Sequence, residues 1–400
     1  MSWEKTTIGV HCTVTSSKRF HLSDRSQEGV PFYCSKEIIQ KVNGQDVVEC
    51  DYIKEEFYES VKERFGVPCA GDLLITSRGT YGIPYIYREN DRFYFADGNL
   101  TWLKDFDNGL SAKYLYYWIL SHEGQKKIDA IAKGIAQKAL PIASIRDIEL
   151  TIPSIELQKK IATILSTYDD LIENNQMQIK LLEEAAQRLY KEWFVDLRFP
   201  GHENTPIIDG VPQGWENGIL DDIVYESGKN EKKENREKYL YYLPIDCLPK
   251  QSIGYTEISD VCLAESSLVA FSKNDIIFGA MRPYFHKVVV ARDSGLTRST
   301  CFVLNARKIE FWAYVAMMMF SKNTVDYATQ ISVGTTMPYA RWKDLKQMPI
   351  IIPTTKLAEE FQKNIKPIID KIEVLSKAIM ALKEARDCLL PQLMSGELEV

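Results

Sequence analysis

A stretch of this chain occurs twice, 200 residues apart, and this repeat constrains the fold more than any other feature of the sequence. Residues 148–161 read IELTIPSIELQKKI, and residues 348–361 read MPIIIPTTKLAEEF. Each copy has the pattern of a strand end, a proline and a helix start. A repeat at this interval indicates two copies of one structural unit.

The similarity between the two copies extends well beyond this stretch. The segment 70–87, AGDLLITSRGTYGIPYIY, resembles 273–290, KNDIIFGAMRPYFHKVVV; each has the pattern of a turn, an apolar strand, a loop with Gly or Arg, and a second strand. Between the shared glycine and proline, LPIASIRDI at 140–148 matches MPYARWKDL at 337–345, which predicts an offset of 197 there. Elsewhere an offset of 200 relates Tyr114, Ser121, Gly134, Pro153 and Leu157 to Tyr314, Ser321, Gly334, Pro353 and Leu357.

Each copy ends in a segment whose apolar residues are spaced alternately four and three apart, which is typical of a coiled-coil seam. A single helix packed on a core would show a similar pattern, but two matched seams favour packing of the two helices on each other. A polar residue such as Asn175 on the seam would fix the register. The predicted seam residues are Ile161, Leu165, Ile172, Asn175, Ile179, Leu182, Ile365, Ile368, Ile372, Leu375, Ile379 and Leu382.

Proline is disfavoured inside a helix, because it lacks an N–H group and its ring clashes with the preceding turn. Pro367 therefore predicts a break, with a short helix after Pro353 and the long helix starting near 367. By analogy, Ser166 is the predicted N-cap of the long helix in the first copy.

The order of these parts predicts an α+β fold with an internal pseudo-two-fold repeat. Two similar globular domains would lie at opposite ends of two long antiparallel helices. About 32 helical residues at a rise of about 1.5 Å would place the two domains about 48 Å apart. The predicted divisions are residues 1–152, the first globular domain; 153–200, the first helical spacer; 201–352, a linker and the second globular domain; and 353–400, the second helical spacer.

The composition of the 400 residues, 45% hydrophobic and 26% charged, is that of a globular protein. The longest apolar run, at 311–320, is too short to cross a bilayer, and the sequence shows no export signal, so we expect a cytoplasmic location. The eight cysteines show neither paired nor zinc-site spacing, which predicts reduced thiols and no metal. A net charge of −6 means that any nucleic-acid contact must depend on local basic patches.

The sequence lacks the motifs of phosphate loops, dinucleotide-binding folds, zinc proteases and serine hydrolases. It also lacks the tetrapeptide, Asn or Asp followed by two prolines and an aromatic residue, with which amino-methyltransferases hold an extruded base. We therefore expect no catalytic residues and interpret the globular domains as binding domains.

Candidate binding residues lie in the loops between the paired strands and in the segments around Gly134 and Gly334. Arg and Lys can contact guanine edges or phosphates, and hydroxyl groups can contact either. A solvated surface charge is the simpler interpretation of any one residue, whereas the set in duplicated positions favours nucleic-acid binding. The predicted residues are Arg78, Thr80, Tyr81, Lys133, Gln137 and Lys138 in the first copy, and Arg282, Tyr284, His286, Lys287, Arg298, Thr335 and Thr336 in the second.

Several motifs together resemble those of the specificity subunits of type I restriction-modification systems, over nearly the whole chain. They are SWEKTTIG, VPQGWENGILDDI, GDLLITSRGTYG, IPSIELQKKIATIL, IPTTKLAEEFQKNI, RLYKEWFVDLRFPG and LLPQLMSGELEV. The resemblance implies two target recognition domains, each reading half of an asymmetric bipartite site on double-stranded DNA, with the helices setting the spacing. It also implies two docked modification subunits that use S-adenosylmethionine, and restriction subunits that use Mg²⁺ and ATP.

Two other functions remain compatible with the sequence. The chain could be the recognition end of a self-sufficient methyltransferase-nuclease, in which case the purified chain alone would methylate DNA. It could also be a coiled-coil protein scaffold, which would not bind DNA even beside a modification subunit.

Overall fold

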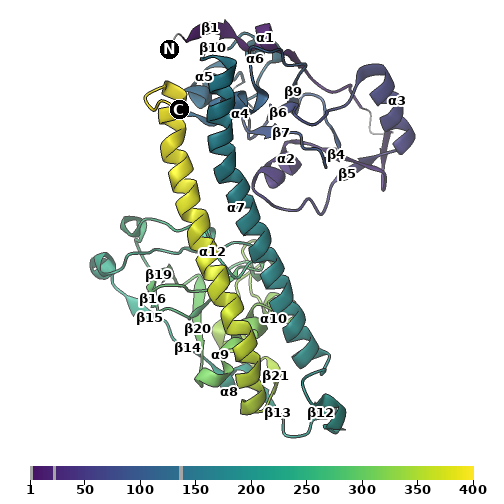
Figure 1. Ribbon diagram of the computed structural model, residues 1–400. Helices are drawn as coiled ribbons and strands as arrows, with labels where there is room; N and C mark the ends of the chain where they lie inside the picture. The colour runs from purple at the N-terminus through teal and green to yellow at the C-terminus, as the bar shows by residue number, and fades with distance from the viewer. Residues whose placement is uncertain (1–2, 21–23, 135–137) are drawn as a thin grey trace. The chain divides into compact units, whose positions relative to one another are not determined.

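The computed structural model describes residues 3–20, 24–134 and 138–400, and these fall into two compact units (Figure 1). Unit one comprises Met1–Glu173 and Leu382–Val400, and unit two comprises Asn174–Ala381. The long helices α7 (Ile155–Tyr190) and α12 (Thr355–Ser395) are each divided between the two units, so that one part of each helix belongs to unit one and the other part to unit two. The mixture of sheets and helices confirms the predicted α+β class, whereas the finer boundaries drawn from the sequence stay a prediction.

The core of unit one is built around β6 (Leu73–Thr76), all four residues of which are buried. Alternate side chains of a strand point to opposite faces, so Leu73 and Ile75 join one apolar cluster and Leu74 joins another. This burial of both faces explains the unbroken apolar run LLI. The sheet order is β2 (Thr13–Thr15), β9 (Leu100–Lys104), β6 and β7 (Pro84–Ile86), all antiparallel, and β1 (Glu4–Thr7) pairs separately with β10 (Glu149–Ile152).

Helices cover one face of this sheet, and a second sheet contributes to the other part of the unit. Tyr114 and Trp118 of α4 (Ala112–Leu120) join the cluster that contains Leu73, together with Ile161 of α7 and Leu393 of α12. The remaining helices are α1 (Ile8–His11), α2 (Ser35–Val42), α3 (Glu55–Phe65), α5 (His122–Ile131) and α6 (Ile142–Arg146). The second sheet has the order β3 (Arg25–Ser26), β5 (Asp51–Ile53), β4 (Val30–Tyr33) and β8 (Tyr94–Phe95).

Unit two repeats the main sheet of unit one with the same strand order. That order is β14 (Val224–Glu226), β20 (Cys301–Ala306), β17 (Ile276–Gly279) and β18 (Val288–Val290), and β13 (Glu216–Ile219) pairs with β21 (Pro349–Ile352). Helices α9 (Trp312–Met319), α10 (Lys322–Gln330) and α11 (Trp342–Leu345) follow in the order of α4, α5 and α6. The other elements are a three-stranded sheet of β15 (Lys229–Glu231), β16 (Leu268–Phe271) and β19 (Gly295–Arg298), the β11 (Ile207–Ile208) and β12 (Val211–Pro212) pair, and α8 (Leu220–Ile223).

The repeat predicted from the sequence is therefore confirmed, but its alignment is wrong in two places. Ile75 pairs with Pro84 and Phe278 pairs with Val288, so the loop of unit two is one residue longer and the ungapped match of 70–87 with 273–290 fails after the loop. The Leu140 amide donates to the Ser77 carbonyl at 2.9 Å, and the Ala340 amide donates to the Ala280 carbonyl at the same distance. Leu140 thus corresponds to Ala340, and the offset stays at 200 instead of falling to 197. The prolines of these two segments are therefore not equivalent. Pro141 corresponds to Arg341, which lies one turn before the buried Leu345.

Within each unit, α7 and α12 lie side by side and run antiparallel, as predicted (Figure 1). In unit one, Asp169 of α7 forms an ion pair with Arg386 of α12 at 2.6 Å. In unit two, Tyr190 of α7 packs on Phe361 of α12, with ring centroids 6.4 Å apart. Trp193, in the π-helical segment Lys191–Val195 that follows α7, packs on the same ring at 5.5 Å. Of the predicted seam residues, Ile161, Leu165, Ile172, Ile179, Ile365, Ile372, Leu375 and Ile379 are buried, while Asn175, Leu182, Ile368 and Leu382 are half-buried.

The predicted helix break at Pro367 and the predicted N-cap at Ser166 are both wrong. Helix α12 continues through Pro367, which is exposed; the missing N–H group removes one hydrogen bond of a 41-residue helix that packing holds elsewhere. The Ser166 hydroxyl lies inside α7 and donates to the Thr163 carbonyl. The Ser154 and Thr354 hydroxyls instead accept from the amides three residues on and cap the two helices.

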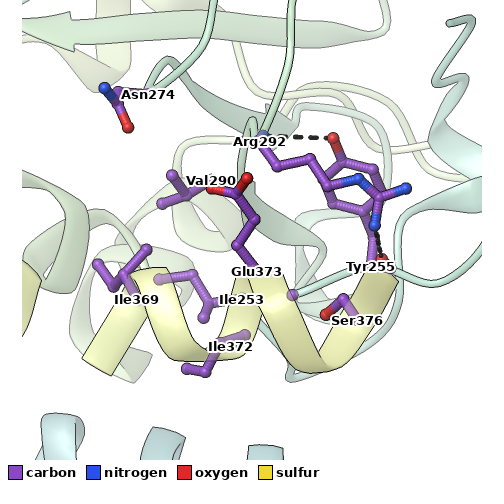
Figure 2. A pocket seen from close by; sticks show the side chains of 10 residues that line it. Ile253, Tyr255, Asn274, Val290, Arg292, Ile369, Ile372, Glu373 and Ser376 are labelled. Carbon is purple, nitrogen blue, oxygen red and sulfur yellow. Dashed lines mark hydrogen bonds between the residues drawn. The ribbon is translucent and has the colours of Figure 1, made fainter. Parts of the chain in front are cut away.

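Helix α12 also packs on the globular part of unit two, which explains why Ile369 is buried when the seam predicted Ile368 (Figure 2). Facing it, the buried Arg292 side chain donates to the Tyr255 carbonyl at 2.9 Å and lies 4.3 Å from the ring of that tyrosine. A cavity of about 20 Å³ remains beside Ser376, with room for one water molecule. Within the described ranges, no helix is long and apolar enough to cross a membrane.

Candidate nucleic-acid interface

In unit one, two segments that are distant in the sequence form one loop surface. The loop 77–83 follows β6, and the main chains of Lys133 and Ala139 form two hydrogen bonds with each other, each of 2.9 Å. The hydrogen bond from Leu140 to Ser77 fixes the second segment beside the first. Lys133 and Lys138 are thereby brought beside the loop that carries Arg78, Thr80 and Tyr81.

The side chains of this surface are mainly cationic and hydroxylic. Arg78, Thr80, Lys133 and Lys138 are exposed, and no ion pair holds any of the three cations in the part of the chain that the structure describes. The Tyr81 hydroxyl donates to the Asp129 carboxylate at 3.1 Å, and the Lys138 ammonium group lies 6.0 Å from the Tyr81 ring. The predicted Gln137 lies outside the described residues. Three free cations on one surface suit an anionic ligand.

In unit two, the corresponding surface joins the loop 280–287 to the segment 333–340. The Arg282 amide donates to the Pro338 carbonyl at 2.7 Å, and its Nη2 atom donates to the Thr336 carbonyl at 3.3 Å. Thr335 and Thr336 are exposed, as is Tyr284. This surface therefore presents hydroxyl groups where unit one presents cations.

Besides Arg282, two more of the predicted residues in this loop contact the protein's own main chain. The His286 Nε2 atom donates to the Phe320 carbonyl at 2.7 Å, and burial lowers the pKa of the imidazole. The Lys287 ammonium group donates to the Ile245 carbonyl at 2.7 Å. Arg298, the last residue of β19, is exposed. Contact of these residues with DNA stays a prediction. The polar groups of His286 and Lys287 already bind main-chain carbonyls, whereas the side chain of Arg298 is exposed.

The two loops share a backbone conformation that they reach with different residues. Gly79 and Gly82 have φ angles of 72° and 81°, and the residues at the equivalent places, Arg282 and His286, have φ angles of 50° and 51°. Glycine adopts this left-handed region at no steric cost, whereas another residue costs about 1–3 kcal/mol. The residue equivalent to Arg78 is Met281, since Arg78 bridges to Ala139 and Met281 to Tyr339.

Sequence reasoning missed residues that reach these loops from elsewhere in the chain. The Lys250 ammonium group lies 4.5 Å from the Phe285 ring, and Asp129 binds Tyr81. No signal in the sequence links Lys250 to a loop more than 30 residues away. Among the described residues, no group of three or more His, Cys, Asp or Glu side chains is placed to hold a metal ion.

Comparison with known proteins gives consistent matches. The family model of the type I restriction modification DNA specificity domain matches the chain twice, over residues 2–184 and 212–384. The type I restriction enzyme MjaIX specificity subunit of Methanocaldococcus jannaschii is 30% identical over 360 residues, which cover 82% of this chain and 78% of that protein. A putative MjaX specificity subunit of the same organism is 24% identical, with 89% and 84% covered.

One solved structure resembles the whole chain. The crystal structure of a type I restriction-modification S subunit from M. genitalium superposes with a TM-score of 0.63 and covers 98% of this chain and 96% of its own. Its sequence is 17% identical, so the likeness concerns the fold alone.

Proposed function

Because the chain belongs to the family of type I restriction-modification DNA specificity subunits, we propose that each of its units reads one half of an asymmetric, bipartite DNA site. One observation carries this proposal: the two units share a strand order and a loop position but present different side chains there. Arg78 and Lys133 occupy the places of Met281 and Val333. Different side chains in the same place are what two different half-sites require.

In this proposal the chain supplies recognition, and partner subunits supply the chemistry. Two modification subunits would dock on α7 and α12 and use S-adenosylmethionine, and restriction subunits would use Mg²⁺ and ATP. The exposed apolar side chains of Leu171, Met177 and Leu181 on α7 support a docking role, since such residues are typical of protein interfaces. The antiparallel helices would then set the spacing between the two half-sites.

We expect the isolated chain to bind DNA weakly and to gain specificity in complex with modification subunits. The reason is the net charge of −6, since phosphate neutralisation by clustered Lys and Arg dominates non-specific affinity. The measurement is DNA binding at about 150 mM salt, with and without modification subunits, combined with mapping of methylated bases. Tight, specific binding by the chain alone would contradict the prediction, and a complex that methylates no bipartite motif would contradict the function.

Within unit one, we expect the substitution Arg78→Ala to weaken recognition at one position of the first half-site. An exposed guanidinium group that no ion pair holds among the described residues can bind a guanine edge bidentately, which is worth about 1–3 kcal/mol of discrimination. The measurement is the methylation rate of the complex on DNA with each single-base change. Lys36→Ala, which removes an exposed cation outside the loop surface, is the control. An equal loss on every sequence would instead identify Arg78 as a phosphate contact.

A further inference from the structure

We propose that Arg282 and His286 are positioning residues that fix the turn Pro283–Phe285, and that Tyr284 at the tip of this turn contacts a base of the second half-site. This inference rests on the proposed function, because it assigns roles within the DNA-reading loop of unit two. It assigns two different roles to Arg282, His286 and Tyr284, which the sequence alone groups as one set of candidate DNA contacts.

The two loops form their ends with different residues. Both have a left-handed residue at each end, and unit one reaches this conformation with Gly79 and Gly82. In unit two, Arg282 and His286 occupy these places despite the steric cost of a side chain there. A strained backbone of this kind persists only where surrounding contacts hold it, so the two side chains must contribute such contacts.

The contacts are present on both sides of the turn. The Arg282 guanidinium group donates to the Thr336 carbonyl at 3.3 Å, and its Nε atom is buried without a hydrogen-bond partner among the described residues. His286 donates to the Phe320 carbonyl, and its ring lies 5.1 Å from the Phe320 ring. Because a carbonyl oxygen only accepts, Nε2 carries the proton of the neutral imidazole. The His286 carbonyl in turn accepts from the Gln251 amide at 2.8 Å.

Tyr284 differs from both of these residues, because it points to solvent. Its side chain is 50% exposed, and its hydroxyl has no hydrogen-bond partner among the described residues. The ring is nevertheless braced, since it packs edge-on against Phe285 at 4.8 Å, and the Lys250 ammonium group lies 4.5 Å from the Phe285 ring. An exposed tyrosine on a rigid turn offers a flat ring and a hydroxyl at low entropic cost on binding.

The test compares Tyr284→Leu, Arg282→Gly and His286→Gly in the complex with modification subunits. We expect all three to reduce discrimination at the same position of the second half-site by about tenfold, as expected for the loss of one base contact. Recognition of the first half-site should not change. Glycine fits both left-handed positions, so the melting temperature of the Arg282→Gly variant should stay unchanged or rise. Tyr225→Leu, which alters an exposed tyrosine of β14, is the matched control.

A double-mutant cycle separates positioning from direct contact. With Tyr284→Leu already present, Arg282→Gly and His286→Gly should add less than about a twofold further loss, because they act through Tyr284. His286→Gln, whose amide can replace the Nε2 donor, should restore most of the discrimination that His286→Gly loses. Additive losses, or losses at different base positions, would show that Arg282 and His286 contact DNA themselves and would overturn the inference.

Two further outcomes are decisive. Unchanged discrimination in the Tyr284→Leu variant, whose substitution lies on the surface and leaves the core intact, would overturn the role of Tyr284. The substitution Tyr284→Phe separates the contribution of the ring from that of the hydroxyl, because it removes only the hydrogen bond between the hydroxyl and the base. A wild-type complex that recognises no bipartite motif would instead overturn the proposed function itself.

Discussion

Replacing residues 1–152 with the equivalent domain of a relative is expected to change one half of the methylated motif completely and to leave the other half intact. The replaced segment ends with β10, before the Ser154 cap of α7, so both long helices remain. It also carries the loop surface around Arg78 and Lys133 as one piece with the sheet that supports it. The measurement is single-molecule sequencing of methylated DNA from cells that carry the hybrid chain.

The reciprocal exchange of residues 201–352 is the control for this experiment. It should change the other half of the motif, and the two exchanges combined should change both. If a single exchange altered both half-sites, recognition would not be divided between the units, and the central part of the proposed function would be wrong.

Inserting seven residues into each long helix is expected to lengthen the non-specific spacer of the motif by about three base pairs. Seven residues add about 10.5 Å at a rise of about 1.5 Å per residue, and a base pair spans about 3.4 Å. The insertion points are after Glu173 in α7 and after Ala381 in α12, where each helix passes from one unit to the other. Neither unit then loses internal contacts, and a full heptad preserves the a and d positions of the seam.

The facing residues of the two helices support this choice of insertion points. The ion pair Asp169–Arg386 lies about one helical turn from both insertion points, since Glu173 follows Asp169 by four residues and Leu382 precedes Arg386 by four. Insertion into one helix alone is the control, and it should abolish activity because it shifts the seam. An active double-insertion protein that still modified the original spacing would show that other elements fix the gap.

Rotation limits the activity expected of the lengthened protein. A heptad rotates a straight helix by only about 20° relative to the seam, whereas three base pairs turn DNA by about 100° at about 10 to 10.5 pairs per turn. The half-sites should therefore be unchanged in sequence while the rate of methylation falls.

The features of the fold that could be predicted from sequence are those written as repeated patterns. The internal repeat predicted two copies of one unit, and the seam spacing predicted an antiparallel helix pair that buries Leu165 and Ile379. Features that depend on tertiary contacts were mispredicted. Pro367 lies on an exposed helix face, where the loss of one hydrogen bond is tolerated, and Ile369 is buried because α12 has a second partner.

The candidate site shows the same limit. The sequence located the loops correctly as chain segments, but it treated Arg78 and Arg282 as similar residues. The structure separates them, because Arg78 is exposed and Arg282 corresponds to Gly79 and donates to a main-chain carbonyl. Backbone angles and the contacts of Lys250 could not be inferred, since neither follows from local sequence patterns.

The sharing of α12 between the units has a consequence for the order in which the protein can fold. Unit two is one continuous segment, Asn174–Ala381, and two of its apolar clusters consist of residues of this segment alone. Unit one needs Leu393 and Met394, which join the apolar cluster of Leu73 and Tyr114 only after all of unit two has been synthesised. Unit one is thus the first unit to be translated and the last to complete its core. A chain that ends at Ala381 contains both of these clusters of unit two but does not complete the core of unit one.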